Sequence, residues 1–406
     1  MDDPTPQAPL CAAPFAALSI AANGAVSPCC EFEGHIGTLA ENSLTEIWQG
    51  DKMADLRAAM ARGEKPKACW KCWQQEEIGS KSLRGSMNLR FGPRVDASPK
   101  RPPPLPHYLD IRFSNLCNFK CRTCHHGASS KWFSDAKALG QESAGQALLA
   151  AFGNAKTAIA QFEEIGENVT DLYFAGGEPL LEKQHFELLR HLIKQKRTNI
   201  RLTYNTNLSN LDFEGSDIVK LWRQFDYLCV AASIDATGAA GALIRSGFDW
   251  AGFRANLARL RNECPDVFIH IGVTVSVFNL LRLPELHMAM VEEGIEPDSV
   301  YFHPVQMPRY YDIAILPKDI KEHAMVQIGA HVAELKANNP KSQAARQLEQ
   351  IITRLSGQSI TADAATGYRQ KFREVTAQLD VLRVENTLET LPELASLVGG
   401  GLDDQA

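Results

Sequence analysis

Residues 107–124 read HYLDIRFSNLCNFKCRTC, and this stretch decides the fold class. Its first half, HYLDIRFS, has the alternation of a β-strand, and three closely spaced cysteines follow it directly. Further strand-like segments occur downstream, separated by helical segments such as FELLRHLIKQKR and FRANLARLRNEC. The expected strands span residues 107–114, 171–176, 200–207, 227–235, 267–277 and 299–305.

Strands that alternate with helices imply parallel pairing through right-handed crossovers. Six such units are too few for an eight-stranded barrel but suit an incomplete one. The sequence therefore predicts the α/β class, as a partial (β/α)6 TIM-like barrel. Its first crossover is the longest, and a pair of helices is expected between Ser130 and Gly166.

The three cysteines of the loop, Cys117, Cys121 and Cys124, have the spacing of metal ligands. Reactive groups of parallel barrels lie at the carboxyl ends of the strands, where this loop begins. Three thiolates can hold three irons of a cubane cluster and leave the fourth iron open to a small molecule. A zinc site is the alternative, with His125 or His126 as the fourth ligand.

The loop and the following GGEP sequence resemble the radical S-adenosylmethionine superfamily, and the resemblance covers residues 107–305. It implies a [4Fe–4S] cluster on the three cysteines, which binds S-adenosylmethionine and cleaves it reductively to a 5′-deoxyadenosyl radical. The GGEP backbone would then bind the methionine amino group, because glycines permit close backbone approach.

The same resemblance implies further cofactor contacts on the later strand ends. A serine and an arginine would hold the ribose and the carboxylate. The sequence departs from the family pattern in two places. Thr123 replaces an aromatic residue, and Phe119 would compensate for it. The segment GVTVSVFN lacks the glycine-rich motif of the family. The expected cofactor-binding residues are Phe119, Gly176, Gly177, Glu178, Pro179, Asn205, Asn207, Ser233 and Arg245.

Four more cysteines lie in the N-terminal block: Cys11, Cys29, Cys69 and Cys72. Asn23–Gly24 predicts a hairpin turn that brings the first two together. Four thiols can close either a structural zinc site or an iron–sulfur cluster. The block resembles a twitch or SPASM domain in CAAPF, EIW and CWKCW, which implies an auxiliary [4Fe–4S] cluster. This domain usually follows the barrel, whereas here it precedes it.

The length of 406 residues predicts two or three domains. The expected division is an auxiliary-cluster domain at 1–92, a proline-rich linker at 93–106, the barrel at 107–311 and a helical C-terminal region at 312–406. No chemistry is expected in the last region, where Asp380 and Arg383 predict a surface ion pair on one helix.

A net charge of −6 argues against a nucleic-acid partner. No apolar run is long enough to span a bilayer, and MDDPTPQAPL lacks the features of a signal peptide, so we expect no membrane partner and a cytoplasmic location. Ten cysteines in a cytosolic chain favour metal binding over disulfides.

The resemblance implies a radical enzyme that abstracts a substrate hydrogen and modifies a peptide or protein, in the manner of RiPP maturases. An electron donor such as flavodoxin or ferredoxin would supply the electron. The alternatives are a dehydrogenase or epimerase acting on a small molecule, and a non-catalytic iron–sulfur or zinc electron-transfer protein. No residue is assigned as catalytic acid or base.

Overall fold

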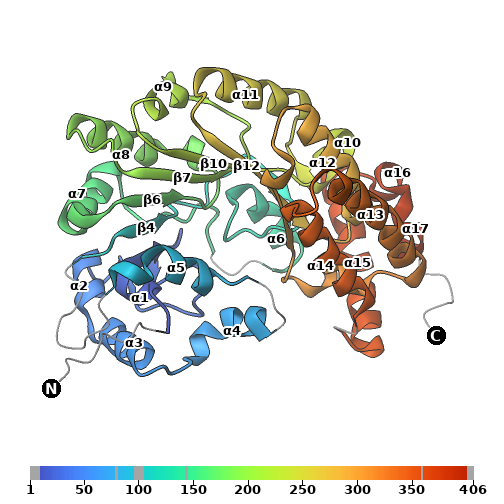
Figure 1. Ribbon diagram of the computed structural model, residues 1–406, viewed down its shortest axis with the longest axis horizontal. Helices are drawn as coiled ribbons and strands as arrows, with labels where there is room; N and C mark the ends of the chain where they lie inside the picture. Colours follow the sequence, from blue (N-terminus) through green and yellow to red (C-terminus); the bar gives the residue numbers. More distant parts are fainter. Residues whose placement is uncertain (1–9, 78–80, 96–104, 142–144, 358–359, 400–406) are drawn as a thin grey trace. The chain divides into compact units, whose positions relative to one another are not determined.

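The computed structural model describes residues 10–77, 81–95, 105–141, 145–357 and 360–399 (Figure 1). The chain divides into two compact units, each described here by itself. The first unit comprises Met1–Leu116, Leu148–Asn205 and Asp212–Leu228, and the second comprises Cys117–Ala147, Thr206–Leu211 and Cys229–Ala406. The domain boundaries proposed from the sequence stay a prediction, and most of the expected linker, residues 96–104, lies outside the described residues.

The first unit is built on a sheet with the strand order β7-β6-β4-β1-β2-β3. Strands β4, β6 and β7 pair in parallel, with Tyr108 opposite Asp171 and Asp171 opposite Arg201. These are three of the strands expected from the sequence. The bounds are β1 Ala17–Ile20, β2 Ala25–Ser27, β3 Gly37–Thr38, β4 Tyr108–Ile111, β6 Asp171–Phe174 and β7 Arg201–Thr206.

The N-terminal hairpin forms at Asn23–Gly24 as predicted, with β1 and β2 antiparallel and Gly24 at φ +81°. In addition β1 pairs in parallel with β4, from Ala17 opposite Tyr108 to Ile20 opposite Ile111. The sequence did not indicate this pairing. Without β1, the β4 edge would expose a row of unpaired backbone donors and acceptors, so the N-terminal block completes the sheet.

Helices α7 and α8 lie beside β6 and β7 in Figure 1. Asn154 caps the N-terminus of helix α7, and its side chain accepts a hydrogen bond from the Thr157 amide. Helix α8 buries His185, whose Nε2 lies 2.8 Å from the Tyr204 hydroxyl. The helices of this unit are α1 Ala13–Ala16, α2 Leu44–Gln49, α3 Asp51–Ala61, α4 Trp70–Glu77, α5 Leu83–Phe91, α7 Ala155–Ile165, α8 Lys183–Lys194 and α9 Ile218–Trp222.

The second unit contains the other three expected strands in the order β13-β12-β10, all parallel. Their bounds are β10 Leu228–Ser233, β12 Phe268–Val275 and β13 Val300–Pro304. Along β12, Ile271, Val273 and Val275 are buried, while Gly272 and Thr274 between them are partly exposed, which fixes the register of the strand. Each of the six predicted strands forms but is shorter than expected.

Seven longer helices complete the second unit: α6 Phe133–Ala138, α10 Gly238–Ile244, α11 Trp250–Glu263, α12 Leu283–Glu292, α13 Lys318–Asn338, α14 Gln343–Ser356 and α15 Ala362–Arg383. Two short ones follow, α16 Thr387–Thr390 and α17 Ala395–Val398. Helix α14 covers the edge strand β13, where Gln347 Oε1 accepts from the Phe302 amide at 3.0 Å. The α/β class with a parallel sheet and a helical C-terminal region is thus confirmed. None of the described helices has the length and apolarity that a bilayer-spanning segment requires.

Candidate functional site

The three-cysteine loop lies in the second unit and is held by hydrogen bonds to its backbone. Its middle part, β5 (Lys120–Cys121), pairs antiparallel with β11 (Arg245–Ser246). Trp132 Nε1 donates to the Cys121 carbonyl at 2.7 Å, and Ser129 Oγ donates to the Phe119 carbonyl at 2.6 Å. The loop backbone is therefore fixed by the protein itself.

Cys117 is buried, and Cys121 and Cys124 are partly buried, which disfavours the ionised form of the thiols. Burial raises the pKa of Cys121, and it raises the pKa of Cys124 to about 12. Iron binds the thiolate, so cluster assembly at this loop releases protons. Within the part of the chain that the structure describes, no three Cys, His, Asp or Glu side chains are arranged to hold one metal ion. The ligands of a cubane bind different irons and need not converge on one point.

Arg245 is an expected cofactor residue whose charged side chain lies close to a loop thiol. Its guanidinium makes two hydrogen bonds to Asp235, at 2.8 and 3.1 Å, and its Nη1 lies 4.0 Å from Cys121 Sγ. Asp235 also accepts from the Thr274 amide at 2.8 Å. Burial acts to lower the pKa of Arg245, but the Asp235 carboxylate together with the nearby Cys121 and Cys124 outweighs burial, and the pKa is raised. A fixed positive charge thus stands beside Cys121, with Ser233 at the end of β10 in the same unit.

Asn207 and Phe119 support the loop from within the second unit. Asn207 Nδ2 donates to Asn118 Oδ1 at 2.9 Å, which ties the loop to the residues after β7. Phe119 is buried and packs edge-on against Phe248, with ring centroids 6.4 Å apart. Asn205 is exposed on β7 in the first unit, so the two asparagines of YNTN have different surroundings.

The GGEP turn lies in the first unit and packs closely on the residues after β4. The Gly177 amide donates to the Ser114 carbonyl at 3.3 Å, and the Glu178 amide donates to the Leu116 carbonyl at 2.7 Å. A Cβ atom on Gly177 would lie 2.1 Å from the Leu116 oxygen. Leu116 immediately precedes Cys117 in the sequence. The turn therefore needs glycine, as a backbone cradle for a ligand does.

The neighbouring motif residues have local roles as well. Gly176 adopts a φ of +118°, which favours glycine. Glu178 is buried, and its Oε1 accepts from the Leu180 amide at 3.0 Å, at the start of a short 3-10 helix that begins at Pro179.

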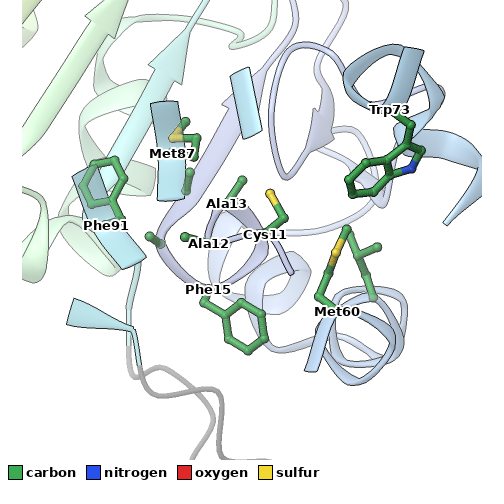
Figure 2. Close-up of a cluster of buried hydrophobic side chains, with 11 residues drawn as sticks. Cys11, Ala12, Ala13, Phe15, Met60, Trp73, Met87 and Phe91 are labelled. Carbon is green, nitrogen blue, oxygen red and sulfur yellow. The ribbon is translucent and has the colours of Figure 1, made fainter. Parts of the chain in front are cut away.

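The four N-terminal cysteines line one pocket of the first unit. Figure 2 shows the Cys11 side chain among Ala13, Met60 and Trp73. Burial raises the pKa of Cys11 to about 11 and that of Cys69 to about 12. Four thiols from three chain segments fit an iron–sulfur cluster by the chemistry of their donors. Cys30 does not line the pocket, which agrees with the choice of Cys29 as the ligand.

One sequence prediction about the C-terminal region is wrong. Asp380 and Arg383 do not form a surface pair with each other. Arg383 has an almost fully buried side chain that pairs with Asp135, and Asp380 pairs with Arg122 of the cysteine loop. The helical spacing could have indicated that both residues face the interior. They continue the stripe of buried residues formed by Phe372, Val375, Thr376 and Leu379.

Fold and site together define an α/β protein with a partial-barrel parallel sheet and two groups of clustered thiols. Two family models match such a chain: residues 111–278 match the Radical SAM superfamily, and residues 11–73 match SPASM, an iron–sulfur cluster-binding domain. The chain therefore contains a Radical SAM domain and, ahead of it in the sequence, a SPASM domain. Its cofactors are S-adenosylmethionine with the [4Fe–4S] cluster that binds it, and an auxiliary iron–sulfur cluster.

Three solved structures illustrate the similarity. anSMEcpe with bound AdoMet and Kp18Cys peptide is 18% identical, with a TM-score of 0.38 over 56% of this chain and 60% of that one. Streptococcus suis SuiB bound to S-adenosylmethionine is 16% identical, with a TM-score of 0.42 over 67% and 58%. SuiB bound to precursor peptide SuiA is 14% identical, with a TM-score of 0.36 over 80% and 64%. The chain thus spans less than two thirds of the length of each.

Proposed function

We propose that this radical SAM enzyme abstracts a hydrogen atom from a peptide or protein and so modifies it, as an oxidoreductase. The observation that carries the proposal is the cysteine loop held beside Arg245, in a chain that also gathers four thiols in its SPASM pocket. Two such groups of thiols supply separate ligand sets for the two clusters.

The chain's residues have distinct roles in this proposal. Cys117, Cys121 and Cys124 hold the barrel cluster, and Cys11, Cys29, Cys69 and Cys72 hold the auxiliary one. When bound, the barrel cluster and S-adenosylmethionine supply a 5′-deoxyadenosyl radical. Arg245 is fixed by Asp235 and orients the cofactor carboxylate, with Ser233 toward the ribose.

The GGEP turn accepts the methionine amino group in the same proposal. Its glycines allow the backbone carbonyls to approach the ligand closely, and the buried Glu178 holds the turn by accepting from the Leu180 amide.

The peptide substrate is proposed from the combination of domains, since the resemblance to SPASM proteins implies such substrates. A flavodoxin or ferredoxin in the cytoplasm would supply the electron. None of the ten cysteines, all of which lie among the described residues, is in a disulfide.

Production of 5′-deoxyadenosine tests the enzymatic part of the proposal. Anaerobically reconstituted protein is incubated with dithionite and S-adenosylmethionine, and the product is measured by chromatography. The wild type is expected to form it, and Cys121→Ala is expected not to. A wild type that holds both clusters and forms none would be an electron-transfer protein instead.

The substrate class is tested separately with short peptides encoded beside the gene. Each peptide is added to the active enzyme under anaerobic conditions and analysed by mass spectrometry. A loss of hydrogen mass on one peptide, with 5′-deoxyadenosine formed in step, supports the proposal. If small-molecule fractions of the cell extract stimulate cleavage and no peptide does, the substrate is a small molecule.

A further inference from the structure

The C-terminal end of α15 is in direct contact with the cysteine loop, although it is far away in sequence. Arg383 is the last residue of the helix, and its Nε donates to Asp135 Oδ2 at 2.8 Å. Its Nη1 donates at 2.8 Å to the carbonyl of Lys120, the residue before Cys121. The side chain of Arg383 is only 1% exposed, so this contact is part of the interior of the second unit.

A second set of contacts holds the loop on the other side of Cys121. Arg122 has a completely buried side chain, and its Nη2 lies 2.5 Å from Asp380 Oδ1 and 2.6 Å from Glu385 Oε2. Glu385 also accepts from Ser246 on β11 at 2.6 Å. The residues on both sides of the middle ligand are therefore held by α15 and by the turn that follows it.

Apolar contacts reach the third cysteine. Val375 and Leu379 of α15 form a buried cluster with Trp132 and Ala136, and Cys124 packs against it. The Arg383 guanidinium lies 4.7 Å from the centre of the Trp132 ring. Because Trp132 also donates to the Cys121 carbonyl, the helix supports the loop through packing as well as through charge.

The charges around the loop balance one another. The charge cluster consists of three basic and three acidic side chains: Lys120, Arg122, Arg383, Asp135, Asp380 and Glu385. An unbalanced positive charge near an iron–sulfur cluster favours its reduced, more negative form, and an unbalanced negative charge disfavours it. The members of the charge cluster can thus influence the midpoint potential of a cluster on this loop.

We propose that the end of α15 is part of the barrel cluster site. Asp380, Arg383 and Glu385 are positioning residues that fix the backbone around Cys121 and set the midpoint potential of the cluster through their charge. This inference rests on the proposed role of the loop cysteines as its ligands. It assigns a task to the C-terminal region, for which the sequence predicted none.

The test is an EPR-monitored redox titration of the reconstituted holoenzyme. Only the barrel cluster changes its EPR spectrum when S-adenosylmethionine is added, so this signal separates it from the auxiliary cluster. Asp380→Asn is expected to raise the midpoint potential, since one negative charge is lost. Arg383→Met is expected to lower it. The control is Glu374→Gln, an exposed position of the same helix that pairs with Lys371 and should leave the potential unchanged.

The outcomes distinguish this inference from the ligand assignment. Loss of the S-adenosylmethionine-responsive signal in Cys121→Ala supports the assignment, and its retention would overturn the assignment itself. If Cys121→Ala loses the signal while Asp380→Asn and Arg383→Met both titrate like Glu374→Gln, the role of α15 is refuted. Should Asp380→Asn not fold, Glu385→Gln removes a charge from the same guanidinium, and the same upward shift is required.

Discussion

Replacing Gly177 by alanine tests the close packing of the GGEP turn most directly. The new Cβ would lie 2.1 Å from the Leu116 oxygen and 2.6 Å from the Asn115 carbonyl carbon, whereas ordinary contact begins at 3.4 Å. Both atoms belong to the backbone, so the turn itself must move. Overpacking costs about 1–3 kcal/mol, and loss of the hydrogen bond from the Glu178 amide adds about 1 kcal/mol.

The bound geometry of the turn is thus disfavoured by about 2–4 kcal/mol, which corresponds to a loss of affinity for S-adenosylmethionine of about 30- to 1,000-fold. Equilibrium dialysis of the anaerobically reconstituted variant measures this Kd. Gly153→Ala is the matched control in the same unit, because no atom lies within 4 Å of its Cβ position. If Gly177→Ala binds the cofactor as tightly as Gly153→Ala does, the turn is not the binding cradle.

Three further predictions concern charge, pH and metal. Asp235→Ala leaves the buried Arg245 charge unpaired and should lower the free energy of unfolding, measured by urea titration, by about 3–5 kcal/mol. Lys336→Ala breaks a more exposed ion pair and should change the same free energy by about 0–1 kcal/mol. Equal effects of the two substitutions would contradict the prediction. Burial lowers the pKa of His185 to about 3, below its unfolded value of about 6.5, so stability present above pH 6.5 is lost as the pH falls toward 3. From pH 7 to pH 5 this loss is about 2 kcal/mol, and His185→Gln should be free of it when both proteins are unfolded thermally at each pH. Reconstituted wild type should contain about eight irons per chain and Cys69→Ala about four; one zinc with about four irons in the wild type would show that the SPASM pocket binds zinc.

The sequence alone was sufficient for the fold class and for the two groups of thiols. The regular alternation of strands and helices is compatible with few chain topologies, so all six strands could be predicted from the sequence. The cysteine loop and GGEP were recognisable because ligand spacing and glycine requirements are local properties of the chain. The Asn23–Gly24 hairpin followed from the same kind of local rule.

Long-range contacts were decided by the tertiary structure. The pairing of β1 with β4 depends on which strand edge remains open, and no short segment of sequence contains that information. In the sequence, Arg122 is only a charged residue in a loop. Its partners Asp380 and Glu385 lie more than 250 positions later and are brought next to it only by the tertiary structure. A buried charge is tolerated only where an oppositely charged partner lies close to it in space. The position of that partner is set by the packing of the whole unit.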